Sequence, residues 1–526
     1  MDQRVQGAAA GGCQADGPGT VEKAADLPSF LPDDVLADVL RRAAPRGLAA
    51  ARCVCKAWRA LIDGRRLLRA ELLPLSLAGF FLNFDGLYIT EFFSRASGEP
   101  CAFGKHDYLP GPVDPRIYCS RSWTLVRDHC NGLLLLDDDY VLNPATKYLA
   151  HLPPCPPSLL DKDCNLKNYL AYDPTLSPNH YEVFAIPRLP YKCGPGGFCY
   201  TSSMGELDPQ VEQSEWPPCQ CMMHVFSSTS GRWEERSLVR HGEAAGTIAD
   251  MRLDYYMSIQ RNAVYWRGEL YATCQNDFVM RISLSENKYQ VIKAPTDIER
   301  SYPYLGKSEK GVYLASIERK FRLRVWILNE SCSGKMEWVL KHDRDLIEWL
   351  LKHRFDKYAS SYDPKGPTPW ISQDINDYYF KDCARHFRNI GAVSVEKFEG
   401  NLETTIDGIN AWRSDSEDEN TEALIEERFE WSSEALVDET SEWSSNNEDI
   451  HHYNGYIQIL GFHPFKDIVF LSESRRRGLA YHLNSSKVEA LGNVYPAGYD
   501  GLYDEEGIKS SFPYTPCLLG PVDKLL

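Results

Sequence analysis

Apolar residues follow two different patterns along the chain, and the first is a helical pattern near its beginning. Val35, Leu36, Val39 and Leu40 recur at the spacing of a helix face and form one apolar stripe. Pro32, followed by two aspartates, suits a first helical turn, because proline fits there and carboxylates favour the positive end of the helix dipole. The pattern predicts a helix that begins just after this proline.

Two shorter helices are expected after the first. Pro45 and Gly47 interrupt the apolar stripe, and residues 48–53 and 55–64 resume it. Three helices in about 40 residues enclose only a small core, so we expect the surplus apolar surface of this module, residues 27–72, to bind another protein. Residues 1–26 are rich in Gly and Ala, and their composition predicts a disordered tail.

The second pattern starts near Phe80 and consists of short strands. A unit of strand, polar turn and strand recurs, with Asn or Ser early in the turn and Lys or Arg late. A further strand opens at each of Gly132, Gly268, Gly311 and Asp467, ahead of a repeated unit. The repeated strings are VLNPATKYLAHLPP from Val141, VFSSTSGRWEERS from Val225, RISLSENKYQVIKAP from Arg281, VWILNESCSGKMEWVLKH from Val325 and AYHLNSSKVEALGN from Ala480.

The spacing of these units favours a β-propeller over residues 80–526. Gly268 and Gly311 lie 43 residues apart, which is in the range of a four-stranded propeller blade. Counting the units predicts about six to eight blades. A β-sandwich or two smaller sheets is the alternative fold. We expect residues 342–452 to form an insertion, because a helical stretch, a proline-rich stretch and an acidic tract interrupt the repeat there.

Charge narrows the classes of partner. The net charge is −17, but residues 415–449 contain 14 acidic residues and one basic residue, so this tract carries −13 and the rest of the chain only −4. Such density predicts a loose, solvated tract, with recruitment of a basic partner or phosphorylation as its functional alternative. Because no basic face is apparent, we do not expect nucleic acid as a ligand.

The sequence carries no signal for a membrane span or for secretion. No apolar run approaches the length of a membrane span, and the first residues lack the apolar core of a signal peptide. We therefore expect no membrane partner and a location in the cytoplasm, the nucleus or both. The 16 cysteines are spread along a long chain, which favours reduced thiols over a disulfide framework.

Enzyme and metal motifs give little support for catalysis. The metalloprotease motif HExxH, the hydrolase motif GxSxG and the phosphate-binding GxxxxGK[ST] do not occur, so we expect no catalytic residues and no cofactor. One cluster has the right residue types for zinc, but its CxC spacing is poorer than CxxC, and loop thiols are the favoured interpretation. This cluster comprises Cys193, Cys199, Cys219, Cys221 and His224.

The helical module resembles a known family. The string LPSFLPDDVLADVLRRAAPRGLAAARCVCKAWRALIDG looks like an F-box, the module that joins a variable receptor to the Skp-family adaptor of cullin-RING ubiquitin ligases. Ala44 departs from the family pattern, which usually has Leu before the proline that is Pro45 here. This smaller side chain should weaken the apolar contact with the adaptor. The resemblance implies adaptor contacts through Leu31, Pro32, Leu36, Leu40, Pro45, Leu48, Val54 and Trp58.

The strand-rich region also carries a resemblance. HCNGLLLLDDDYVLNPATKYLAHLPP is similar to the kelch-like, F-box-associated domains of large plant receptor families. The resemblance implies a plant protein whose propeller holds a target while its F-box reaches the adaptor and, through it, the cullin. We expect the irregular loop of Tyr191, Phe198 and Tyr200 to contact the target. A scaffold acting outside any ligase and a propeller enzyme are the alternatives.

Overall fold

A computed structural model defines two compact units, divided between Leu73 and Pro74. The structure describes residues 31–43, 45–52, 54–68, 76–87, 89–95, 125–137, 139–157, 164–192, 207–253, 262–295, 303–331, 334–353, 370–376, 455–474, 476–496, 499 and 507–521. The predicted tail, residues 1–26, and the acidic tract, residues 415–449, lie outside these ranges.

The first unit consists of three short helices, α1 (Asp33–Arg41), α2 (Pro45–Arg52) and α3 (Lys56–Gly64). Two aspartates occupy the first turn of α1, where the helix dipole favours negative charge. At the start of α3 the Cys55 thiol accepts a hydrogen bond from the Trp58 backbone N–H, at 3.5 Å. The predicted all-helical module is therefore present.

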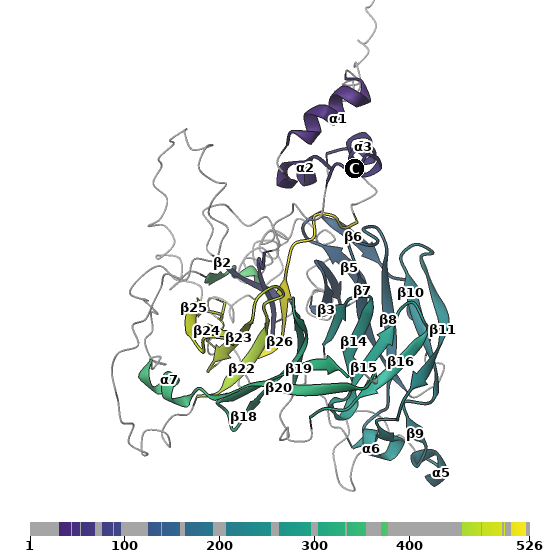
Figure 1. Cartoon of the computed structure of the whole chain (residues 1–526), viewed down its shortest axis with the longest axis vertical. Helices are drawn as coiled ribbons and strands as arrows, with labels where there is room; N and C mark the ends of the chain where they lie inside the picture. Colours follow the sequence, from purple (N-terminus) through teal and green to yellow (C-terminus); the bar gives the residue numbers. More distant parts are fainter. Residues whose placement is uncertain are drawn as a thin grey trace, which may run out of the picture. The chain divides into compact units, whose positions relative to one another are not determined.

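The second unit is built from antiparallel sheets, and Figure 1 shows their strands. Among the described residues, six groups of four strands can be distinguished. Three of them, counted along the chain from β3, are β3 (Val126–Cys130), β4 (Leu133–Leu136), β5 (Tyr140–Asn143) and β6 (Tyr148–His151); β7 (Asn165–Tyr172), β8 (Tyr181–Arg188), β10 (Gln220–Ser227) and β11 (Arg232–His241); and β13 (Ala263–Trp266), β14 (Glu269–Thr273), β15 (Val279–Ser283) and β16 (Lys288–Ile292).

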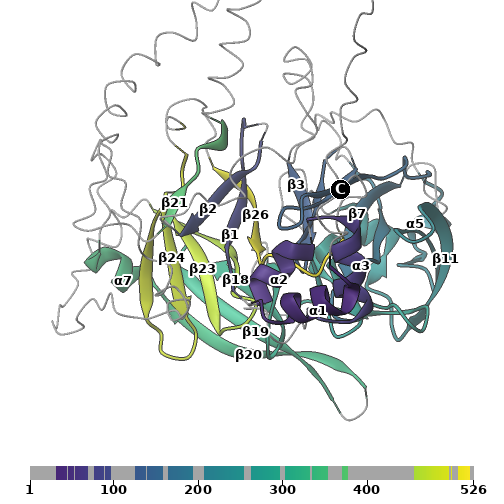
Figure 2. The ribbon, with the colours of Figure 1, turned by 90° about the horizontal axis from the view of Figure 1, so that it is seen from above.

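The remaining three groups follow the same plan. They are β17 (Tyr304–Ser308), β18 (Gly311–Glu318), β19 (Arg322–Glu330) and β20 (Met336–Asp345); β22 (Ile457–Phe462), β23 (Ile468–Glu473), β24 (Arg477–His482) and β25 (Val488–Asn493); and β26 (Ile508–Tyr514), β1 (Gly79–Phe84), β2 (Glu91–Arg95) and β21 (Trp370–Ser372). Figure 2 shows β26, β1 and β2 side by side, although β26 lies far along the chain from its partner β1.

The first strand of each group faces the first strands of its neighbours. Each of these first strands contacts the next one in the order β3, β7, β13, β17, β22 and β26, and β26 contacts β3 again. The contacts therefore form a closed ring. The apolar clusters also join neighbouring groups, since Leu323 and Val325 of β19 pack with Val469 and Leu471 of β23. Radially arranged four-stranded sheets are consistent with a β-propeller. The second and third groups are further joined by parallel pairing of β11 with β16.

The repeated strings of the sequence correspond to equivalent strands. Each of the five contains the third and fourth strands of a group, and Gly132, Gly268, Gly311 and Asp467 lie at or just before the second strand. Gly132 and Gly268 have φ angles of 92° and 85° in the turn before that strand, a conformation that residues with a Cβ rarely adopt. The repeat therefore reflects the folding unit.

β22 and the residue that follows it are closely packed. Gly306 of β17 lies against the Phe462 ring of β22, so closely that an added Cβ would overlap the ring. His463, which follows β22, is buried, and its Nδ1 accepts a hydrogen bond from the Phe465 backbone N–H at 3.1 Å. Burial lowers the pKa of His463 to about 4.

The span predicted as an insertion, residues 342–452, contains parts of the second unit. It begins within β20, continues into α7 (Ile347–Lys352), and supplies β21, which pairs with β2. Trp370 of β21 is buried in an apolar cluster. The buried Glu91 carboxylate accepts hydrogen bonds from the backbone N–H groups of Ile375 and Asn376, each at 2.8 Å. Residues 370–376 are thus fastened to the sheet.

Candidate functional site

The interior of the helical unit is small and is filled by one apolar cluster. Leu36 and Leu40 of α1 pack against Leu48 and Ala51 of α2 and against Ile62 of α3. All five are buried. Because Leu36, Ala37 and Leu40 are the buried residues of α1, its two valines, Val35 and Val39, remain on its surface.

That surface is apolar on one side of α1. Val35 and Val39 lie four residues apart, which places them on one face of α1, and Leu31 stands just before the start of this helix. The exposed fractions of Leu31, Val35 and Val39 are 48%, 46% and 55%, and Val54, between α2 and α3, is 58% exposed. Large apolar side chains exposed together mark a surface that binds another protein. We call these four residues the apolar face.

The predicted adaptor contacts divide between this face and the core. Leu31, Pro32 and Val54 are exposed, whereas Leu36, Leu40 and Leu48 are buried inside the unit. Trp58 is half-buried against the core, and Pro45 begins α2, but its side chain lies outside the described residues. Sequence reasoning left Val35 and Val39 out of the set. The signal was there, because four apolar residues in two adjacent pairs cover more surface than a three-helix core can bury.

Two ion pairs hold the helices that present the apolar face. The buried Arg52 guanidinium binds both Asp63 carboxylate oxygens, at 2.7 and 3.0 Å, which ties α2 to α3. Arg65, after α3, binds Asp34 in the first turn of α1 at 2.6 Å. The bidentate pair has the stronger geometry, so it contributes more to the orientation of the helices.

The target and zinc residues predicted in the second unit are only partly described. Tyr191 is half-buried, and Phe198, Tyr200, Cys193 and Cys199 lie outside the described residues. The two described cysteines of the predicted zinc cluster differ in exposure. Cys219 is exposed, whereas burial raises the pKa of the Cys221 thiol to about 12.

The histidine of that cluster has a protein partner. His224 Nε2 lies 3.0 Å from the carbonyl oxygen of Pro157. Within the part of the chain that the structure describes, no three His, Cys, Asp or Glu side chains are placed to hold a metal ion. The described part of the cluster therefore gives no metal-binding geometry.

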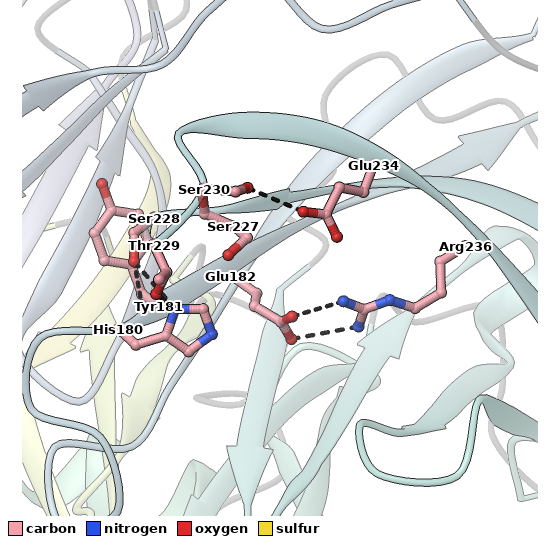
Figure 3. Close-up of polar contacts among 9 residues, drawn as sticks. All are labelled: His180, Tyr181, Glu182, Ser227, Ser228, Thr229, Ser230, Glu234 and Arg236. Carbon is pink, nitrogen blue, oxygen red and sulfur yellow. Dashed lines mark hydrogen bonds and ion pairs between the residues drawn. The ribbon is translucent and has the colours of Figure 1, made fainter.

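A polar cluster at the turns of β7–β8 and β10–β11 has the residue types of a nucleophilic site. Thr229 Oγ1 lies 2.8 Å from His180 Nδ1, and Ser228 Oγ lies 3.3 Å from the same nitrogen. Figure 3 shows these side chains together. Nucleophilic catalysis also needs a group that orients the base. The nearby Glu182 carboxylate is instead held by Arg236, at 2.7 and 3.4 Å. These contacts stabilise two turns and do not assemble a catalytic triad.

Comparison with known families assigns the helical unit. Residues 29–70 match the F-box-like family. No curated protein matches the chain in sequence. Among the described residues, no helix is long and apolar enough to cross a membrane. The chain therefore combines an F-box-like domain with a strand-rich domain consistent with a propeller.

Proposed function

We propose that this protein is a substrate-receptor subunit of an SCF-type cullin-RING ubiquitin ligase. The observation that carries the proposal is the apolar face of the F-box-like domain, since Leu31, Val35, Val39 and Val54 are exposed although the domain has a complete small core. F-box domains generally bind Skp-family adaptors, and an apolar adaptor groove would cover such a face. The adaptor then links the receptor to the cullin.

The mechanism of such a receptor is proximity. A target held by the second unit would have its lysines near a charged ubiquitin-conjugating enzyme, and the effective concentration of the reacting groups would rise. The receptor itself supplies no reacting group, so we propose a non-catalytic role. Its place of action would be the cytoplasm, the nucleus or both.

The second unit would be the target-binding part. We propose that its six groups of strands are the blades of a kelch-like propeller, with β26 completing the blade of β1 and β2. The loop that starts at Tyr191 leaves the end of the sheets opposite to the repeated turns, and loops on a rigid frame are suited to binding. A scaffold that acts outside a ligase is the competing function.

Binding to a purified Skp-family adaptor tests the proposal. Replacing Leu31 and Pro32 together by Ala should abolish adaptor binding by the full chain. A matched control is Leu176→Ala, because Leu176 is 75% exposed on the second unit. Undiminished binding by the double variant would refute the proposed interface. Adaptor binding without cullin in the purified complex would favour the scaffold.

A further inference from the structure

One lysine crosses the end of the ring that the first strands form. The ammonium of Lys307, on β17, donates a hydrogen bond to Asn131 Oδ1 at 2.7 Å and another to the Tyr265 carbonyl oxygen at 2.9 Å. Asn131 directly follows β3, and Tyr265 belongs to β13. Because β7 and β13 lie between β3 and β17 in the ring, the Lys307 side chain joins groups of strands that are not neighbours. It is half-buried there.

Both hydrogen-bond acceptors of Lys307 are neutral. Its ammonium forms no ion pair with a carboxylate of the described residues, and two of its three N–H donors are used. A charge that is withdrawn from water and given only neutral partners is costly for the folded chain. Burial accordingly lowers the pKa of Lys307. One donor and the positive charge therefore remain for a ligand.

Asn131 supplies a second donor beside this ammonium. Its amide oxygen faces Lys307, which can only donate, and its Nδ2 donates to the Tyr172 carbonyl oxygen at 2.6 Å. This bond uses one of the two amide hydrogens, and the other has no partner among the described residues. The oxygen and the nitrogen of an amide share one carbon atom, so the second donor lies next to the ammonium. Asn131 is half-buried as well.

The titratable groups around Lys307 leave one negative charge near it. Burial, with the Lys307 charge as a second cause, lowers the pKa of His129 to about 3, and burial raises the pKa of Cys130 to about 12, so both are uncharged at neutral pH. The nearby carboxylate is Asp173. Its Oδ1 is bonded within its own turn, and its Oδ2 accepts a hydrogen bond from the Tyr265 hydroxyl at 3.3 Å. Asp173 thus weakens the positive potential but does not occupy the two donors.

We propose that Lys307 and Asn131 form a binding site for a single carboxylate. One carboxylate oxygen would accept the remaining ammonium N–H, the other would accept the remaining amide N–H, and the negative charge would pair with Lys307. Such charge-assisted hydrogen bonds are shorter and stronger than those between neutral groups. The carboxylate belongs either to a small organic acid or to an acidic side chain or C-terminus of a protein. This site does not depend on the proposed ligase function.

The test measures how fast Lys307 reacts as an amine in the full chain. A trace of deuterated acetic anhydride labels the neutral form of each lysine, and mass spectrometry of peptides gives the rates. A bound carboxylate favours the charged ammonium, so sodium formate should slow labelling of Lys307 at least about fivefold relative to sodium chloride of equal ionic strength. Lys310, which follows β17 and is paired with Asp467, is the internal control and should be unaffected. Equal rates at Lys307 in the two salts would overturn the proposal.

A substitution at the second donor sharpens this test. Asn131→Asp places a carboxylate beside Lys307, so labelling should be slow without formate and should not slow further with it. The matched control is Asn287→Asp, because Asn287 is exposed and shares the left-handed backbone of Asn131, with φ angles of 53° and 46°. This control should respond to formate like the wild type. Wild-type rates and formate protection in a folded Asn131→Asp would contradict the site; if this variant does not fold, the wild-type comparison still decides.

Further probes distinguish the source of the carboxylate. Acetyl-triglycine and acetyl-Gly-Glu-Gly-amide carry a terminal and a side-chain carboxylate, and acetyl-triglycine amide carries none. Stronger protection of Lys307 by the two carboxylate peptides than by formate supports a protein partner, and stronger protection by formate supports a small acid. Protection by the uncharged peptide, or stronger protection by inorganic phosphate than by any carboxylate, would overturn the assignment. No adaptor is present, so failure here would leave the proposed function untouched.

Discussion

Neighbouring residues of α1 should respond in opposite ways to truncation. Val39 is 55% exposed on the apolar face, whereas Leu40 is 4% exposed in the core of the F-box-like domain. We predict that Val39→Ala leaves the domain folded and weakens adaptor binding. Leu40→Ala should unfold the domain and thereby abolish binding.

The magnitudes follow from burial. A buried Leu→Ala change costs about 2–5 kcal/mol, and a module of this size rarely has more than about 3–5 kcal/mol of stability. An exposed substitution usually changes stability by less than about 0.5 kcal/mol. If the adaptor buries the Val39 side chain, losing two methyl groups costs about 1–1.5 kcal/mol of binding free energy, or roughly a tenfold increase in Kd.

Two measurements on the full chain check this prediction. Titration calorimetry with the purified adaptor gives the affinity, and amide hydrogen exchange over α1 to α3 reports whether the helices are formed. Retained protection in Leu40→Ala together with unchanged affinity in Val39→Ala would show that the two faces of α1 had been assigned the wrong way round.

Three further predictions concern the second unit. Between pH 6.5 and about 4 the unfolded chain binds a proton at His463 that the folded chain does not bind. As the pH is lowered through this range, the free energy of unfolding should therefore decrease by up to about 1.4 kcal/mol per pH unit. Urea unfolding of His463→Gln should lack this decrease, and an identical slope in the variant would contradict the prediction. Glu91→Ala leaves two buried N–H groups unpaired and should cost about 2–3 kcal/mol, with faster proteolysis after residue 376; unchanged cleavage would show that the segment is held otherwise. Gly306→Ala should lower the melting temperature and cost about 1–3 kcal/mol, because the added Cβ would overlap the Phe462 ring; an unchanged melting temperature would contradict this prediction.

Local patterns in the sequence predicted many of the hairpins of the second unit. The five repeated strings each predicted a hairpin because turn chemistry and strand alternation are read within about fifteen residues. Pairings between strands that are distant in the sequence could not be predicted from it. Trp370 lies in a stretch that was assigned to an insertion, yet β21 pairs with β2, and nothing local in three residues indicates that partner.

The candidate site shows the same division. The exposed position of Leu31 and Val54 agrees with a binding role, but sequence alone assigned Leu36 and Leu40 to the interface and omitted Val35 and Val39. Spacing identifies which residues share a helix face, whereas the choice between core and surface depends on where α2 and α3 pack. That information lies in the tertiary structure.

The pairing of β26 with β1 has a consequence for synthesis of the protein. The F-box-like domain needs only residues that leave the ribosome early, whereas the sheet of β1 stays incomplete until residues 508–514 have emerged. At about 5–20 residues per second, the interval between the two strands is on the order of a minute. On the proposed function, the F-box-like domain would be ready to bind an adaptor during that time, while the strand-rich domain is unfinished. Chains that stop short of β26 would then bind adaptors without a complete second unit.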